Sequence, residues 1–155
     1  MTEPRFLCDE MLGRLCRYLR AAGYDATLAK GGEPDAHLLQ QAIAEQRIFL
    51  TCDQKILEHN AACEVAVVLP TGNLNQLAAF LKQHLGLDWL HAPFSRCLVD
   101  NRVLRPADRD GILRIPQDAR RAGERFMACP ACGRVYWRGS HLRRMMGYLR
   151  RWAEG

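Results

Sequence analysis

The sequence predicts an α/β protein whose parallel sheet is covered by helices. In the first ninety residues, short apolar runs alternate with segments whose apolar residues recur at helical spacing. This alternation is typical of strands joined by helices around a parallel sheet. After about residue 90, short segments, frequent arginines and a Cys-x-x-Cys pair replace that pattern. We therefore expect two domains, residues 1–90 and residues 91–155.

Apolar spacing and breaking residues predict the individual elements. Strands are expected at residues 5–8, 24–28, 47–51 and 65–69, the last being an uninterrupted apolar run that suits a strand buried on both faces. Helices are expected at residues 11–22, 34–46, 54–61 and 73–85, and Gly23 is placed to end the first of them. In the second domain one helix is expected, at residues 140–152.

The net charge of +5 is the sum of two halves of opposite sign. Residues 1–90 contain 8 Lys and Arg against 11 Asp and Glu, a net charge of −3. Residues 91–155 contain 14 Arg against 6 Asp and Glu, a net charge of +8. Carboxylates bind cations and guanidinium groups bind polyanions, so the two halves indicate two different tasks. A simple balance of charge for solubility is the alternative.

Three aspartates are predicted to converge at one edge of the sheet. Asp9 follows the first strand, Asp53 follows the central one, and Asp35 lies at the start of a helix that begins on the same edge. Converging carboxylates repel one another unless a hard divalent cation such as magnesium or manganese compensates them. Asp9 and Asp35 have an alternative role, because an aspartate also stabilises the first turn of a helix. Glu10 and Glu58 are weaker candidates for additional ligands.

The seven cysteines favour metal binding or burial over disulfides. Their number is odd, the first residues lack an apolar export signal, and no apolar stretch reaches the length of a membrane span. We therefore expect a cytoplasmic protein without a membrane partner. Cys8, Cys16 and Cys63 lie among apolar residues and are expected in the core. The remaining candidates for a metal site are Cys97, Cys129 and Cys132.

The sequence resembles the Mut-seven C-terminal ribonuclease-domain family, a branch of the PIN-like nucleases. The resemblance begins with the run from Phe6 to Arg20, followed by Gly23 and Asp25, and continues through Asp35 with Leu38 and Leu39. It includes the segments 47–53, 94–101, 129–137 and 139–141. The matching segments extend over nearly the whole chain, and their combination is more specific than any single one.

The resemblance implies a PIN-like fold with an attached zinc ribbon, and metal-dependent cleavage of RNA. Carried over position by position, the acidic ligands of magnesium or manganese are Asp9, Asp35 and Asp53. Family members of the PIN type often have a further acidic residue shortly after the third, where this chain has Gln54 and Lys55.

In the ribbon, the first half-site of the family contains two cysteines, whereas this chain has Asp100 in place of the second. Aspartate also ligates zinc, so Cys97, Asp100, Cys129 and Cys132 can form a four-coordinate site. His141 or His91 is an alternative ligand. A ribbon without metal, held together by packing alone, is the other possibility.

Arginines near the ribbon and on the first helix are candidates for RNA contacts. Arginine binds phosphates, and aromatic side chains stack on unpaired bases. Tyr136 and Trp137 are equally suited to the small core of the ribbon, and for Trp137 we favour the core. The candidate arginines are Arg14, Arg17, Arg20, Arg134, Arg138, Arg143, Arg144, Arg150 and Arg151.

Two other functions compete with a metal-dependent ribonuclease. One is a non-catalytic RNA-binding protein whose ribbon binds RNA and whose α/β half is a scaffold. The other is a phospho-receiver-like signalling domain, which also has acidic residues after the first and central strands. A receiver domain needs a lysine after a fifth strand, and no lysine occurs at a suitable place.

Overall fold

The computed structural model describes residues 2–120 and 125–155. One sheet is formed by β1 (Phe6–Cys8), β2 (Ala26–Leu28), β3 (Ile48–Thr51) and β4 (Ala66–Val68). Its helices are α1 (Gly13–Ala21), α2 (Asp35–Glu45), α3 (Ala62–Val65) and α4 (Leu74–Leu85). Later elements are β5 (Arg105–Pro106), α5 (Arg109–Leu113), β6 (Met127–Ala128), β7 (Val135–Tyr136) and α6 (Ser140–Glu154). Short 3-10 helices lie at Glu10–Leu12, Gln54–Glu58 and Gln117–Ala119.

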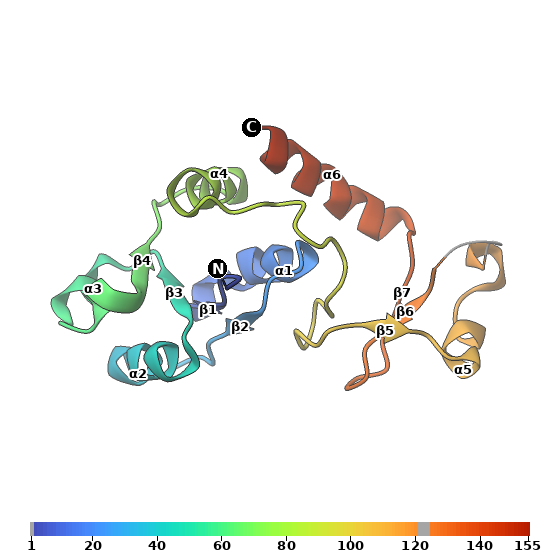
Figure 1. The fold of residues 1–155 in the computed structure, drawn as a ribbon, viewed down its shortest axis with the longest axis horizontal. Coiled ribbons are helices and arrows are strands. Elements are labelled where there is room, and N and C mark those ends of the chain that lie inside the picture. Colours follow the sequence, from blue (N-terminus) through green and yellow to red (C-terminus); the bar gives the residue numbers. More distant parts are fainter. Residues whose placement is uncertain (1, 121–124) are drawn as a thin grey trace.

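The first four strands form a parallel sheet in the order β2-β1-β3-β4. Side chains of β1 alternate between two apolar layers, because Phe6 and Cys8 pack with residues of α1 and α4 whereas Leu7 packs with residues of α2. Figure 1 shows α4 and α2 on opposite sides of the strands. The predicted fold class, a parallel sheet between helices, is confirmed.

Three details of the predicted first domain are wrong. The helix expected at residues 54–61 is interrupted, because His59 has extended backbone angles between the 3-10 helix and α3. The strand β4 is half-buried and not buried on both faces, because it is the last strand of the sheet order. Cys63 on the short helix α3 is exposed, whereas Cys8 and Cys16 are buried in the core as expected.

The terminal helix α6 packs against α1 and α4. The ring of Trp152 lies edge-on to Tyr18 and to Trp89, with ring centroids 5.0 and 4.9 Å apart, and its indole N–H donates to Asn75 Oδ1 at 2.8 Å. The main apolar cluster therefore includes residues from both sides of residue 90. The architecture changes near that residue, and the division into two domains stays a prediction.

The strands β5, β6 and β7 form a small antiparallel sheet in that order. Figure 1 places this sheet and α5 at the end of the molecule opposite to α2 and α3. Among the described residues, no helix combines the length and the apolar character that a membrane crossing requires.

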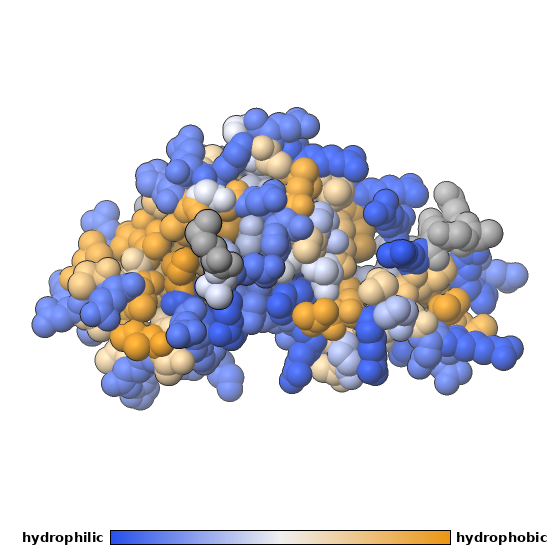
Figure 2. Space-filling model, viewed as in Figure 1, coloured by the Kyte–Doolittle hydropathy of each residue, from blue (hydrophilic) through white to orange (hydrophobic). Residues whose placement is uncertain are grey.

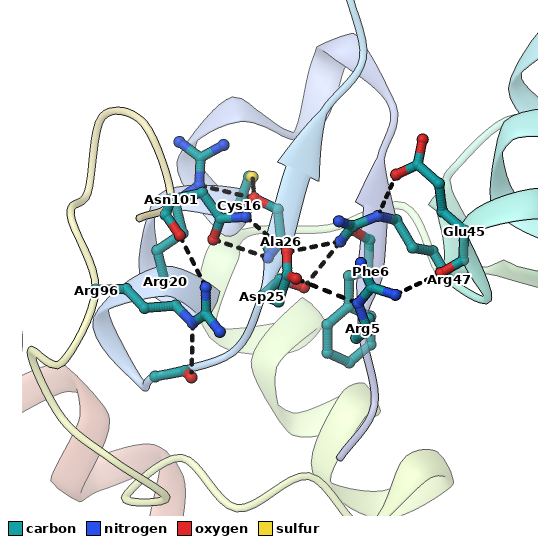
Figure 3. A network of polar contacts seen from close by, with 11 residues as sticks. Arg5, Phe6, Cys16, Arg20, Asp25, Ala26, Glu45, Arg47, Arg96 and Asn101 are labelled. Carbon is teal, nitrogen blue, oxygen red and sulfur yellow. Dashed lines mark hydrogen bonds and ion pairs between the residues drawn. The ribbon is translucent and has the colours of Figure 1, made fainter. Parts of the chain in front are cut away.

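A polar network around Asp25 joins the starting ends of three neighbouring strands (Figure 3). Asp25 precedes β2, and its carboxylate accepts hydrogen bonds from Arg47 Nη1 at 2.7 Å and from Arg5 Nε at 3.2 Å. Arg5 and Arg47 each directly precede a strand, β1 and β3 respectively. Asn101, distant in sequence, donates to Asp25 Oδ1 at 2.6 Å and accepts the backbone N–H of Ala26.

These contacts set the ionisation of Asp25. Burial raises the pKa of its carboxyl group, but the hydrogen bonds from Arg47 and Asn101 outweigh burial and lower the pKa to about 2. A carboxyl group with a lowered pKa stabilises the folded state at pH values above its unfolded pKa, near 3.9, and loses that contribution as the pH falls towards 2.

Replacing Asp25 with asparagine should therefore lower the free energy of unfolding at pH 7 by about 2 kcal/mol, because the shift corresponds to that much interaction with the charged form. Urea denaturation of the wild type and of Asp25→Asn should show this difference at pH 7 and a much smaller one at pH 2. The matched control is Asp110→Asn, at an exposed position. Equal differences at both pH values would contradict the assignment.

Candidate active site and metal cluster

Asp9 and Asp53 lie at the ends of adjacent parallel strands and are connected through Thr51. Asp9 directly follows β1, and Thr51 is the last residue of β3. The Thr51 hydroxyl donates to Asp9 Oδ2 at 2.8 Å and accepts the backbone N–H of Asp53 at 3.1 Å. Because Thr51 is only 1% exposed, its hydroxyl has a fixed position. This hydroxyl therefore links the carboxylate of Asp9 to the backbone of Asp53.

Both aspartates also cap the 3-10 helices that follow them. Asp9 Oδ1 accepts the backbone N–H of Glu10 at 2.8 Å, and Asp53 Oδ1 accepts that of Lys55 at 2.9 Å. The capping role considered for Asp9 is thus real. An ionised carboxylate has about four lone-pair sites, so capping leaves both groups free to accept a cation.

Asp35 lies in the first turn of α2, at the edge of the sheet where β2 ends. Its Oδ2 is 3.9 Å from Nε2 of His59, which follows the 3-10 helix behind Asp53. The oxygens of the three aspartates nevertheless do not form a group within 4.8 Å in the described part of the chain. Glu10 and Glu58 are exposed. The role of Asp9, Asp35 and Asp53 as metal ligands stays a prediction.

Thr51 and His59 were not among the residues predicted from the sequence. For Thr51 the available signal was its place at a strand end, two residues before Asp53. The approach of His59 to Asp35 depends on the path of the chain and has no comparable local signal.

The four residues expected for zinc do converge. Cys97, Asp100, Cys129 and Cys132, here called the metal cluster, offer ligand atoms that all lie within 4.8 Å of one another. Cys97 Sγ and Cys132 Sγ are 3.9 Å apart, and Cys129 Sγ is 3.5 Å from Asp100 Oδ2. Among the described residues this is the one such group of three or more potential ligands. A metal such as zinc can therefore bind here.

The spacing fits a tetrahedral zinc ion. With zinc–sulfur bonds of about 2.3 Å and zinc–oxygen bonds of about 2.0–2.2 Å, two sulfur ligands lie about 3.8 Å apart and a sulfur and an oxygen about 3.5–3.7 Å apart. The Cys97–Cys132 and Cys129–Asp100 distances are close to these two values. The alternative ligands are engaged elsewhere, since His91 Nε2 contacts Glu3 and His141 Nε2 contacts Arg17.

A buried tyrosine contacts one of the cysteines of the metal cluster. The Tyr136 hydroxyl lies 3.1 Å from Cys97 Sγ and accepts the backbone N–H of Leu98, also at 3.1 Å. Burial raises the pKa of Tyr136 well above its usual value, and the hydrogen bond to Cys97 acts in the same direction. Tyr136 thus belongs to the core of the small module, and its hydroxyl orients the Cys97 thiol.

Cys132 of the metal cluster is difficult to ionise without a cation. The backbone N–H of Arg134 lowers the pKa of Cys132, but burial and the hydrogen bonds with Asp100, Cys129 and Cys97 raise it to about 11. A bound cation reverses this balance, because a coordinating thiol is deprotonated.

The segment that carries Cys97 and Asp100 is attached to the parallel sheet. Arg20 of α1 donates to the carbonyls of Leu98 and Val99, at 3.1 and 2.9 Å, and to that of Ala26 at 2.8 Å. Arg20 was considered for RNA contacts, but its guanidinium is engaged within the protein. The other eight candidate arginines are exposed: Arg14, Arg17, Arg134, Arg138, Arg143, Arg144, Arg150 and Arg151.

Protein purified without chelator should contain about one zinc ion per chain, as four-coordinate sites of this kind do. Replacing Cys97 and Cys129 with serine should remove the metal, because serine hydroxyls do not supply thiolate ligands. Asp100→Cys should retain zinc and Asp100→Ala should weaken its binding. Elemental analysis and competition with a colorimetric chelator measure both effects. Cys63→Ser, outside the metal cluster, is the control. Zinc content that is unchanged in the double serine variant would contradict this site.

No curated protein and no solved structure is significantly similar to the chain. The sequence profile of the Mut7-C RNAse domain matches residues 4–149, nearly the whole length. This match implies RNA as the substrate. The chain belongs to the Mut7-C RNAse domain family.

Proposed function

We propose that the chain is a metal-dependent ribonuclease that hydrolyses RNA phosphodiester bonds at a magnesium or manganese site formed by Asp9, Asp35 and Asp53. The observation that carries this proposal is the connection of Asp9 to Asp53 through the buried Thr51 hydroxyl. It holds the carboxylate of Asp9 and the backbone of Asp53 at the carboxyl ends of neighbouring parallel strands, where the sites of open α/β sheets lie. The family match supports the reaction class.

The chain's own groups are suited to this chemistry in distinct ways. Asp9 and Asp53 are oriented by hydrogen bonds that leave oxygen lone pairs for a cation, and Asp35 supplies a further carboxylate from α2. A bound magnesium or manganese ion would activate water and stabilise the leaving oxygen of the phosphodiester. The side chains of Asp9 and Asp35 are half-buried and that of Asp53 is exposed, so a polymer can reach the site from solvent.

The exposed arginines are proposed to bind the RNA backbone. Arg17 lies 3.0 Å from His141 at the start of α6, so α1 and α6 contribute to one basic surface. Figure 2 shows hydrophilic residues along the outer side of α6. We include the eight exposed arginines in this surface and exclude Arg20, whose Nε and Nη1 donate to backbone carbonyls. The metal cluster would be a structural zinc site of a PIN-like nuclease with a zinc ribbon.

A cleavage assay separates this proposal from a non-catalytic RNA-binding protein. Zinc-loaded protein should degrade single-stranded RNA when magnesium or manganese is added and should leave it intact without them. A protein that binds RNA but cuts it under neither condition would be the non-catalytic alternative.

Asp9→Asn and Asp53→Asn should each reduce metal-dependent cleavage at least about 100-fold while leaving the fold intact, because the amide keeps the shape but removes the charge that binds the ion. Asp35→Asn should have a milder effect. Single-turnover cleavage of a labelled RNA measures the rates, and Asp110→Asn is the matched control. Wild-type rates in both Asp9→Asn and Asp53→Asn would exclude this active site.

Thr51 is predicted to be a positioning residue for the two aspartates. Thr51→Val keeps the shape of the side chain but removes the hydroxyl, so it should lower metal affinity or activity about 10- to 100-fold. Thr51→Ser restores the hydroxyl and should recover most of the loss. The informative readout is the manganese concentration that gives half of the maximal rate. If Thr51→Val cuts RNA as Thr51→Ser does at every manganese concentration, Thr51 does not position the site.

A further inference from the structure

The three tryptophans of the chain occupy two different environments. Trp89 and Trp152 are buried, and the indole N–H of each donates a hydrogen bond, to Ala78 O at 3.0 Å and to Asn75 Oδ1 at 2.8 Å. Trp137 is half-buried, and no hydrogen bond of its indole occurs among the described residues. The role in the core that was expected for Trp137 belongs instead to its neighbour Tyr136, which is buried against Cys97.

Trp137 borders an open cavity of about 180 Å³ beside the metal cluster. The indole lies close to Gly139, since a Cβ atom added there would be 3.0 Å from Trp137 Nε1. The cavity is smaller than the sites of about 300 Å³ and above that hold drug-sized ligands, so it suits one ring. Its lining residues are Arg114, Ile115, Gly133, Arg134, Val135 and Trp137.

The charge of this cavity is entirely positive. Arg114 and Arg134 lie at its border, and no described lining residue is acidic. Arg114 is held in place, because its Nη2 donates to the carbonyl of Gly133 at 3.1 Å. Gly133 has a left-handed backbone with φ of 75°, and its N–H donates to Cys129 O in the turn of the metal cluster. Arg114 is thus placed by the turn that carries two of the four metal ligands.

A planar aromatic surface next to two cationic groups fits one class of ligand. An unpaired nucleobase stacks on an aromatic side chain, and the phosphate next to it pairs with guanidinium groups. We propose that this cavity is a subsite for one nucleotide of single-stranded RNA, with the base on Trp137 and the phosphate between Arg114 and Arg134. The inference rests on the proposed function for its choice of RNA as the ligand.

The position of the subsite has a consequence for substrate length. It belongs to α5, the small sheet and their connections, which lie at the end of the molecule opposite to α2 and α3 (Figure 1). Only a long single strand would occupy this subsite and the carboxylate edge together. A short RNA would reach the carboxylates without the subsite.

Binding to an uncleaved RNA tests the subsite directly. Zinc-loaded protein that carries Asp53→Asn binds a labelled single-stranded RNA of about 20 nucleotides, followed by fluorescence anisotropy. Trp137→Ala should weaken binding about 10-fold, within the range for one stacked base, and Trp137→Phe should retain most of the affinity. Arg114→Gln and Arg134→Gln should each reduce the slope of log affinity against log salt by about 0.7. Arg109→Gln, an exposed α5 arginine that does not line the cavity, is the control.

Further measurements with double-stranded RNA and with a free nucleotide test whether the cavity binds an unpaired nucleotide. Double-stranded RNA, whose bases are stacked inside, should bind without any dependence on Trp137. Free nucleoside monophosphate that quenches tryptophan fluorescence in the Asp53→Asn protein, but not in its Trp137→Phe derivative, would support the same subsite. If Trp137→Ala loses zinc, the arginine variants and the fluorescence comparison with Trp137→Phe still decide. Unchanged affinity in Trp137→Ala, together with an unchanged salt slope in Arg114→Gln and Arg134→Gln, would overturn the proposal.

The subsite and the proposed hydrolysis fail in different ways. RNA binding that depends on Trp137, without metal-dependent cleavage, would support the subsite and contradict the ribonuclease proposal. Metal-dependent cleavage, with an RNA affinity that is independent of Trp137, Arg114 and Arg134, would support the active site and contradict the subsite.

Discussion

The hydrogen bonds of the Asp25 carboxylate determine how the first three strands and the candidate site at their ends are arranged. The carboxylate binds guanidinium groups that precede two other strands, so the starts of β1, β2 and β3 are joined at one point. Arg47 in this network is almost fully buried, which makes the loss of its partner costly. Because the strands are short, fixing their starts also determines where their carboxyl ends lie. Those ends carry Asp9 and Thr51.

The same carboxylate connects the parallel sheet to the metal cluster. Asn101, one residue beyond Asp100, donates to Asp25, while Arg20 binds the carbonyls between Cys97 and Asp100. The segment that supplies half of the metal ligands is therefore attached to β2 and α1. A metal bound by the cluster would link this segment to the turn at Cys129 and Cys132. The metal cluster and the parallel sheet would then be joined through one segment of the chain.

The sequence was informative wherever the signal is local. Apolar periodicity predicts the strands and helices, and a residue directly after a strand is recognised as a candidate ligand. The convergence of Asp100 with the three cysteines could also be predicted, because aspartate is a chemically acceptable zinc ligand. Asp25 was different, because its partners Arg5, Arg47 and Asn101 lie 20, 22 and 76 positions away. Arg20 illustrates the same limit, since its place on a polar helix face indicated solvent and not the carbonyls that bind it.

The central claim is that the carboxylates after β1 and β3 hold the divalent ion required for RNA cleavage. Measuring manganese binding and cleavage on one sample tests this claim most directly. Electron paramagnetic resonance of zinc-loaded protein gives the bound fraction of manganese, and the cleavage rate of a labelled RNA is followed at the same concentrations. The account predicts that both curves rise together and that Asp53→Asn shifts both to higher manganese concentration. Manganese binding that Asp53→Asn leaves unchanged, or cleavage that proceeds without manganese or magnesium, would contradict it.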